Sequence, residues 1–287
     1  MSPNIRPARP DDTGAIAAFT TATFSWGDYV GEEFPNWFDD PDVCVAVVTD
    51  EGDSPVAVAR VKMLGPREGW LSAARVHPDH RRRGLGSALN DWCVGWVSSQ
   101  GGLVCRLQIE TDNEPAHNQV LQLGYRLVMA ALNVERPTRL PPDSNGAKHS
   151  RPPERLQRAP RAESDLAFMA WSTGDLARRA RGMFAVEPWA WRRLQELDIR
   201  SGVLWVCPFG WILTDEFDEE LHVRWLTCSP DDAGSLLSAV IDLAREREKS
   251  SISMAVPDVD WLTTIVGRLG FITSHPSRIY EKSLPLT

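Results

Sequence analysis

The chain has 287 residues, of which 43% are hydrophobic and 24% are charged, so it is long enough for two ordinary globular domains. The formal net charge of −8, without a basic stripe carrying interleaved aromatic residues, argues against nucleic acid as a partner. We find no apolar segment that could span a bilayer and no signal-peptide pattern, so we expect a cytoplasmic protein without a membrane partner.

Cysteine and histidine usage predicts neither disulfides nor a metal site. The five cysteines are odd in number and lack Cys-x-x-Cys spacing, which favours free, mostly buried thiols in a reducing compartment. The six histidines show no metal-ligand spacing, so we expect no metal.

The first residues predict a short strand that leads into a helix. Residues 5–7 lean toward β structure, Asp11 and Asp12 are suited to cap a helix, and an apolar run begins at Thr13. A loop-rich segment follows, up to Pro41.

The segment from Ser72 to Leu89 is the most informative part of the chain. It reads Ser-Ala-Ala-Arg-Val-His-Pro-Asp-His-Arg-Arg-Arg-Gly-Leu-Gly-Ser-Ala-Leu. The pattern predicts a strand that stops at Pro78, a glycine loop, and a helix N-terminus. Glycines allow close backbone approach, the first N–H groups of a helix lack partners, and arginines supply positive charge, so the segment favours a pyrophosphate.

Other phosphate-binding motifs fit this segment less well. No Lys-Ser or Lys-Thr follows Gly86, as a P-loop requires, and Leu89 stands where a dinucleotide fingerprint has its third glycine. A solvated basic surface loop stays the alternative.

The pattern Arg81-x-x-Gly84-x-Gly86 resembles the acyl-CoA pyrophosphate loop of the GCN5-related N-acetyltransferases, the GNAT superfamily. The resemblance covers about residues 5–136 and implies an α/β fold. In that fold, a mixed and mostly antiparallel central sheet is flanked by helices, and its fourth and fifth strands splay apart. The other matching residues precede and follow the loop: Val76, Pro78, Asn113, Ala116, Leu123, Gly124 and Tyr125.

The superfamily's order of elements, placed on this sequence, predicts the secondary structure of the first half. The expected strands are residues 5–7, 43–49, 56–63, 71–76, 103–110 and 126–135, and the expected helices are residues 13–23, 84–99 and 115–123.

The resemblance implies that acetyl-CoA is the cosubstrate and that an amine attacks its thioester directly. A backbone N–H near the end of the fourth strand would hold the oxyanion. The residues expected to bind the cosubstrate are Ala74, Arg75, Val76, Arg81, Arg82, Arg83, Gly84, Leu85, Gly86, Ser87 and Asn113.

The residues for proton transfer depart from the family pattern. Val120 stands seven residues after Asn113, where the family often has a tyrosine. Water, His117 or Tyr125 could act as the acid instead, the alternatives being an exposed helix position for His117 and a core aromatic for Tyr125. Glu110 is the best-placed base, the alternative being a solvated strand end or a helix cap. The predicted catalytic residues are therefore Glu110, Asn113 and His117.

The loop-rich segment covers the acceptor site in the superfamily. Its polar residues could receive a cationic substrate or keep a surface loop soluble. Residues 27–42 also resemble a stretch of histidine N-acetyltransferase-like proteins, which implies a free amino acid or another small amine as the acceptor. A peptide N-terminus and an aminoglycoside remain open. The predicted substrate-binding residues are Asp28, Tyr29, Glu32 and Glu33.

The second half of the chain looks like a second copy of the first. Residues 137–155 are rich in Pro and polar residues and predict a linker between domains at 1–136 and 156–287. A predicted strand ends at Pro230, and a helix at 236–247 and a strand at 252–256 follow.

The spacing in the second copy predicts the loss of one ligand site. Pro78 lies 46 residues before Gly124, whereas Pro230 lies 40 residues before Gly270. In place of the glycine loop stand the adjacent carboxylates of residues 231–232, which would repel a pyrophosphate or cap the next helix. We expect this domain to keep the fold, to cover a face of the first domain and to help shape the acceptor pocket.

The sequence therefore predicts two tandem GNAT-like domains and an N-acetyltransferase that modifies the primary amine of a small molecule. We expect a monomer, with a dimer left open. The alternative is a non-catalytic acyl-CoA-binding sensor or scaffold, which the valine at position 120 and the altered second half favour.

Overall fold

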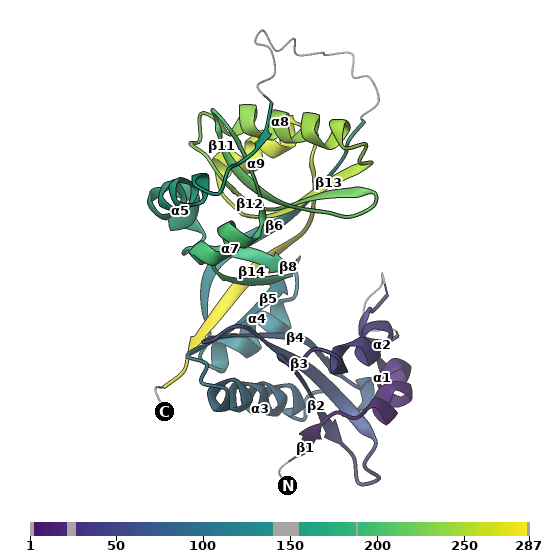
Figure 1. The fold of residues 1–287 in the computed structure, drawn as a ribbon. Helices are drawn as coiled ribbons and strands as arrows, with labels where there is room; N and C mark the ends of the chain where they lie inside the picture. The colour runs from purple at the N-terminus through teal and green to yellow at the C-terminus, as the bar shows by residue number, and fades with distance from the viewer. Residues whose placement is uncertain (1–2, 22–26, 140–154, 188, 286–287) are drawn as a thin grey trace. The chain divides into compact units, whose positions relative to one another are not determined.

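A computed structural model describes residues 3–21, 27–139, 155–187 and 189–285 (Figure 1). Internal contacts divide the chain into two compact units. Most of the predicted linker lies outside the described residues, and the domain limits 1–136 and 156–287 stay a prediction. Unit 1 comprises Met1–Ile109, Asn113–Leu127 and Tyr280–Thr287, and unit 2 comprises Glu110–Asp112 and Val128–Ile279.

The sheet of unit 1 follows the chain order, and its neighbours are antiparallel except β4 and β5, which are parallel. The C-terminal end of β14 (Ile272–Ser283) lies beside β5. The strands in order are β1 (Asn4–Pro7), β2 (Val43–Thr49), β3 (Pro55–Gly65), β4 (Glu68–Val76) and β5 (Val104–Glu110).

Helices cover both faces of this sheet, as Figure 1 shows. On one face, α3 (Leu85–Ser99) and α4 (Glu114–Gln122) share a core with the strands. On the other face, α1 (Thr13–Thr20), α2 (Val30–Glu33) and the 3-10 helix η2 (Phe34–Phe38) lie over a second core. The buried residues of this second core include Ile16, Val30, Phe34, Trp37, Val47 and Val58.

The predicted elements of the first half are confirmed to within a few residues, with one correction. The segment expected to be loop-rich up to Pro41 contains α2 and η2. Phe34 and Trp37 bury their rings in the core, and this burial holds two short helices in a segment whose polar composition suggested a loop.

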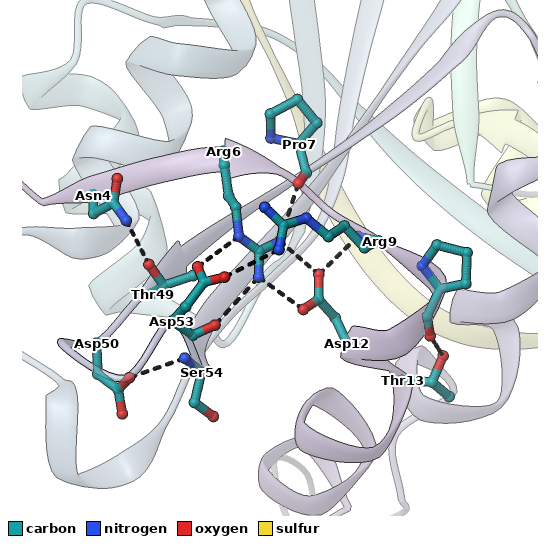
Figure 2. A network of polar contacts seen from close by, with 11 residues as sticks. Asn4, Arg6, Pro7, Arg9, Asp12, Thr13, Thr49, Asp50, Asp53 and Ser54 are labelled. Carbon is teal, nitrogen blue, oxygen red and sulfur yellow. Dashed lines mark hydrogen bonds and ion pairs between the residues drawn. The ribbon is translucent and has the colours of Figure 1, made fainter.

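An ion-pair network fixes the first strand to the turn between β2 and β3 (Figure 2). Arg6 donates to both oxygens of Asp12, at 2.8 and 2.9 Å, and to Asp53 at 2.9 Å, while the N–H of Arg9 donates to Asp12 at 2.7 Å. Burial acts to raise the pKa of Asp12, but these hydrogen bonds outweigh it and hold the pKa below its ordinary value. The network also caps the N-terminus of the short 3-10 helix η1 (Pro10–Asp12), because Asp12 accepts from the N–H of the N-cap residue Arg9.

Unit 2 repeats the order of elements seen in unit 1. Three antiparallel strands precede a helix, a strand parallel to the third of them, and a second helix, and β14 follows. A two-stranded hairpin, β8 (Met183–Glu187) and β9 (Ala190–Arg193), is added to this plan. The repeated elements are β10 (Val203–Cys207), β11 (Gly210–Glu216), β12 (Glu220–Thr227), α8 (Ala233–Glu246), β13 (Ser251–Pro257) and α9 (Asp260–Arg268).

The remaining elements of unit 2 complete its edges. The short strand β7 pairs with β10, β6 pairs with β13, and α5 and α7 pack on each other. Among the helices that the structure describes, none has the length and apolar character needed to cross a membrane. The bounds are β6 (Arg126–Pro137), β7 (Gln157–Arg158), α5 (Glu163–Thr173), α6 (Asp175–Arg179) and α7 (Glu196–Ser201).

Candidate functional site

The parallel strands β4 and β5 diverge after a short paired stretch. Their register begins at Glu68 opposite Val104 and ends at Trp70 opposite Arg106. Beyond that point the described residues 71–76 of β4 and 107–110 of β5 are not paired with each other. We call these two stretches the β4–β5 divergence. It is the predicted splay, and it leaves the backbone edge of β4 without a strand partner on one side.

Backbone groups of β4 point into the β4–β5 divergence. The register between β3 and β4 shifts opposite Ala73, whose φ of +56° costs a non-glycine residue about 1–2 kcal/mol. The N–H of His77 donates to Val56 on β3 at 2.9 Å. Because successive residues of a strand point to opposite sides, the N–H and C=O of Ala74 and Val76 face away from β3 and toward the divergence.

A buried ionic cluster closes the base of the divergence. Arg106 is 2% exposed and is hydrogen-bonded to both Glu68 and Glu281, the latter at 2.8 Å. Arg126 donates to the other oxygen of Glu281 at 2.8 Å. Burial acts to raise the pKa of Glu281, but its hydrogen bonds and the two positive charges outweigh this effect and lower the pKa. The cluster holds β4 and β5 together at the point where they begin to separate.

The predicted glycine loop forms a concave array of backbone N–H groups at the start of α3. Arg82 and Gly84 both have positive φ, at +61° and +76°, and Gly84 is the N-cap residue of the helix. Within the described chain, the N–H groups of residues 82–87 have no hydrogen-bond acceptor. Alternating left-handed residues at a helix N-terminus make an anion-binding nest, so this loop is built to receive a phosphate.

The two glycines of the loop are needed for different reasons. At Gly84 a Cβ would meet no atom within 4 Å, so only the left-handed backbone favours glycine. At Gly86 a Cβ would approach Nε2 of Gln119 on α4 to 2.9 Å. The same amide donates to Ser87 Oγ at 3.3 Å. Gln119 is therefore a residue of this site that the sequence analysis missed, because a lone polar residue on a helix carries no motif.

The three loop arginines are exposed and have different partners. Nε of Arg81 donates to the C=O of Val76 at 3.4 Å, and Arg83 donates to the C=O of Asp79 at 2.9 Å. The structure gives the Arg82 side chain no hydrogen bond or ion pair with any residue that it describes. Positive charge and free N–H groups thus meet at one end of the β4–β5 divergence.

The structure gives each predicted catalytic residue its own partner. Asn113 is the N-cap of α4, where its Oδ1 accepts from the N–H of Ala116 at 3.3 Å. Glu110 ends β5 and lies 3.2 Å from Nδ1 of His275. His117 is 3% exposed, with Nδ1 2.9 Å from the Tyr280 hydroxyl, so the alternative of an exposed helix position was wrong. The catalytic roles of the three stay predictions.

The residues around the missing tyrosine belong to the core. Val120 is buried, and Tyr125 is 3% exposed and hydrogen-bonded to Asn90 at 3.1 Å. Burial raises the pKa of Tyr125. Tyr125 is thus a core aromatic, the alternative that the sequence analysis had left open.

The predicted acceptor residues separate into a buried pair and an exposed pair. Asp28 accepts two hydrogen bonds from Arg75, at 2.6 and 3.2 Å, and its side chain is fully buried. The Arg75 guanidinium lies 5.8 Å from the ring centre of Tyr29. Glu32 and Glu33 are exposed on α2. Their substrate-binding roles stay predictions.

Unit 2 has an equivalent divergence that its own side chains line. The parallel register of β12 and β13 ends at Val223 opposite Met254. Beyond it lies a cavity of about 20 Å³, with room for about one water molecule. The cavity is lined by residues of both strands and by aromatic residues that include Phe184 and Trp191 of the added hairpin and Trp171 of α5.

The turn that replaces the glycine loop in unit 2 carries no nest. No residue between Cys228 and Gly234 in the described chain has a positive φ. Asp232 is the N-cap residue of α8, but its carboxylate bonds Ser229 Oγ at 2.7 Å and makes no cap to the helix. The turn is thus acidic, and its backbone follows an ordinary path into the helix.

Cysteines and candidate metal ligands are dispersed. None of the five cysteines, all of which the structure describes, forms a disulfide, and burial raises the pKa of the Cys105 thiol to about 12. Within the described ranges, His, Cys, Asp and Glu side chains form no group of three or more that could hold a metal ion.

Comparison with known proteins identifies the first part of the chain. The model of the acetyltransferase (GNAT) family matches residues 14–125. No curated protein matches the sequence.

Solved structures share the fold of nearly the whole chain. A GCN5-related N-acetyltransferase from Sphaerobacter thermophilus has a TM-score of 0.65 at 17% identity, covering 98% of this chain and 95% of that one. One from Kribbella flavida has a TM-score of 0.51 at 16% identity, covering 99% and 72%. A glucosamine N-acetyltransferase region of a fungal β-N-acetylglucosaminidase has a TM-score of 0.63 at 13% identity, covering 97% and 38%. With the β4–β5 divergence and the glycine loop inside the matched range, residues 14–125 belong to the GNAT acetyltransferase family.

Proposed function

We propose that this protein transfers an acetyl group from acetyl-CoA to the primary amine of a small molecule. One observation carries the proposal. The β4–β5 divergence, with backbone groups directed into it, ends at a loop whose six successive N–H groups have no acceptor among the described residues. A phosphate-bearing ligand with an extended, amide-containing arm matches both features.

The residues of the loop fit the pyrophosphate of acetyl-CoA. The N–H groups of residues 82–87 supply donors and the positive end of the α3 dipole, and Arg82 has no competing partner in the described chain. The C=O and N–H of Ala74 and Val76 would pair with the amides of the arm, as a neighbouring strand would. These contacts would place the thioester beside Val76.

The strand edge then supplies the electrostatic part of catalysis. The N–H of Val76 faces the divergence, where it would donate to the thioester oxygen as negative charge develops there. The acceptor nitrogen forms a bond to the carbonyl carbon, the carbon–sulfur bond breaks, and the sulfur leaves with the bonding pair. The amine loses one proton and the leaving thiolate takes one up. Holding both reactants in one geometry would contribute much of the acceleration.

Proton transfer is assigned to Glu110, with water as the relay. Its carboxylate lies at the end of β5, half-buried, with one oxygen 3.2 Å from Nδ1 of His275. Asn113 would act by placing the start of α4. His117 faces Tyr280 in the core, so any role it has would pass through that hydroxyl.

Burial of three residues favours a second candidate, a non-catalytic acyl-CoA-binding protein. Val120, Tyr125 and His117 are all buried, so each is poorly placed to protonate a departing thiolate. A thiol leaves tolerably well as a thiolate, because its pKa lies near 8.5, so the enzyme can work without a dedicated acid. Because the reaction does not require a dedicated acid, burial of these three residues does not exclude catalysis, and the acetyltransferase stays our first proposal.

The two functions are separated by measuring binding and turnover together. Calorimetry reports the affinity for acetyl-CoA, and release of free thiol from acetyl-CoA across a panel of primary amines reports transfer. The acetyltransferase requires amine-dependent thiol release. Tight acetyl-CoA binding without turnover on any amine would establish the sensor or scaffold instead.

A further inference from the structure

Two acidic residues of the segment before β2 are paired with cations of the protein. Asp28 is neutralised by Arg75, and Asp40 accepts an ion pair from Lys62 at 2.9 Å. These two carboxylates are therefore engaged by cations of the protein, whereas Glu32 and Glu33 are exposed on α2. A cationic acceptor would have to compete with a buried, two-bond ion pair to reach Asp28.

Arg60 is a cation near these pairs, and its charge helps Lys62 to lower the pKa of Asp40. Arg60 lies on β3, half-buried, with its guanidinium carbon 5.6 Å from the ring centre of Trp37. Its Nε is buried and has no hydrogen-bond partner, and the structure gives its side chain no ion pair among the described residues. A buried donor without an acceptor carries a desolvation cost that a bound anion would remove.

Arg60 is placed beside the proposed reaction path. Its backbone pairs with Ser72 of β4, just past the last paired residue of β4 and β5 and just before the bulge at Ala73. Its positive charge and that of Arg75 both act to lower the pKa of the Tyr29 hydroxyl, although burial outweighs them and raises it. The Arg60 guanidinium lies 5.6 Å from the ring centre of Trp37 and that of Arg75 lies 5.8 Å from the ring centre of Tyr29, so two guanidinium groups and a phenol lie on the helix α2 side of the strands.

We propose that Arg60, with the Tyr29 hydroxyl, binds a carboxylate of the acceptor, so that the substrate is a free α-amino acid. This inference rests on the proposed function and names the substrate class for the same site. Arg60 is a specificity-determining residue, because a guanidinium offers paired N–H donors that match the two oxygens of a carboxylate. The α-amino group, two bonds from that carboxylate, would then face the β4–β5 divergence.

The experiment compares each amino acid with its carboxamide and its decarboxylated amine, which share a side chain and an amine. We expect kcat/KM for the acid to exceed that for the amide by about 10- to 100-fold, the range for a lost charged hydrogen bond. Arg60→Gln keeps a polar side chain beside Trp37 but removes the charge. In this variant we expect kcat/KM for the acid to fall by the same factor. The value for the amide stays unchanged, and the loss appears mainly in KM.

Lys62→Gln is the matched control. Lys62 lies two residues after Arg60 on β3, and its substitution removes the same positive charge. It should leave the ratio of acid to amide unchanged. Calorimetry with the N-acetyl amino acid and its amide in the presence of coenzyme A gives a second readout, in which Arg60→Gln weakens only the acid.

The outcomes separate this inference from the function beneath it. If kcat/KM for amides and amines equals that for the acids, or if Arg60→Gln lowers the values for acid and amide equally, the carboxylate site is overturned. The proposed acetyltransferase activity would be unaffected by that result. No thiol release with any acid, amide or amine would overturn both.

Discussion

Units 1 and 2 build the same junction of two parallel strands with different chemistry. Glu68 and Glu220 are the first residues of β4 and β12, and each bonds the third residue of the next parallel strand, Arg106 in unit 1 and Ser253 in unit 2. Both pairs of strands then diverge after three or four matched residues. The shared geometry belongs to the fold, whereas the differences after it determine what each unit can bind.

The differences lie in the turn and in what lines the divergence. Unit 1 follows β4 with an arginine-rich nest at the helix N-terminus, and unit 2 follows β12 with two aspartates on an ordinary turn. In unit 2 the hairpin β8–β9 also supplies aromatic side chains beside the diverging strands and leaves room for about one water. A fold can thus keep its strand geometry while losing the groups that neutralise a ligand's charge.

The largest expected effect comes from Arg106. Arg106→Met leaves the partly buried Glu68 without this cation and Glu281 with only the exposed Arg126, which should lower the free energy of unfolding by about 3–5 kcal/mol. Ser253→Ala at the equivalent position of unit 2 should cost only about 1 kcal/mol, because Glu220 is partly exposed and stays hydrated. Urea unfolding of both variants measures the difference. Equal losses would contradict the view that the two junctions are held by different forces.

The next effect concerns the loops. The double variant Arg82→Gln/Gly84→Ala removes one cation and the left-handed N-cap, and should weaken acetyl-CoA binding by about 100-fold or more. Asp231→Asn/Asp232→Asn in unit 2 should leave the Kd unchanged. Calorimetry of both proteins tests the assignment of the ligand to one unit. A changed Kd in the aspartate variant would show that unit 2 takes part in binding.

A smaller effect tests a feature that both units share. Arg192 donates to Asp198 at 2.7 Å and the N–H of Gln195 donates to the same carboxylate at 2.7 Å, with the spacing seen at Arg6, Arg9 and Asp12. Asp12→Asn and Asp198→Asn should each cost about 1.5–3 kcal/mol, since each weakens charged hydrogen bonds. Urea denaturation gives the loss in free energy of unfolding for each variant. A loss outside this range in only one of the two would contradict a common role.

The smallest effect is a difference in pH dependence. Burial lowers the pKa of His222 below its ordinary 6.5, so its contribution is present above about pH 6.5 and is lost as pH falls below it. The lowered pKa of Glu281 keeps its contribution until pH falls below about 4.5. Between these values β12 and β13 should weaken while β4 and β5 do not.

Hydrogen exchange of the two strand pairs at about pH 7 and pH 5.5, corrected for intrinsic rates, measures this difference. His222→Gln keeps a hydrogen-bonding side chain beside Ser253 and should abolish the response of unit 2. A response that persists in His222→Gln, or that is equal in both units, would assign the effect to other groups.

Much of the fold could be predicted because its signals are local. The glycine loop, the proline that ends β4 and the alternating strands of the first half each depend on neighbouring residues, and their elements match the prediction closely. The helices α2 and η2 were missed because burial of Phe34 and Trp37, and not local propensity, stabilises them. Gln119 was missed for a related reason, since its proximity to Gly86 joins two helices.

The sequence by itself determined that one half of this chain carries an arginine-rich glycine loop at a helix N-terminus and the other does not, because a phosphate nest needs specific residues at fixed spacing. Only the tertiary structure decided which of the charged residues pair with one another. The carboxylate of Asp28 forms an ion pair with Arg75, which lies 47 residues away in the sequence. Arg60 makes no ion pair among the described residues. The interaction between two charges depends on their distance in space, and this distance does not follow from their separation in the sequence.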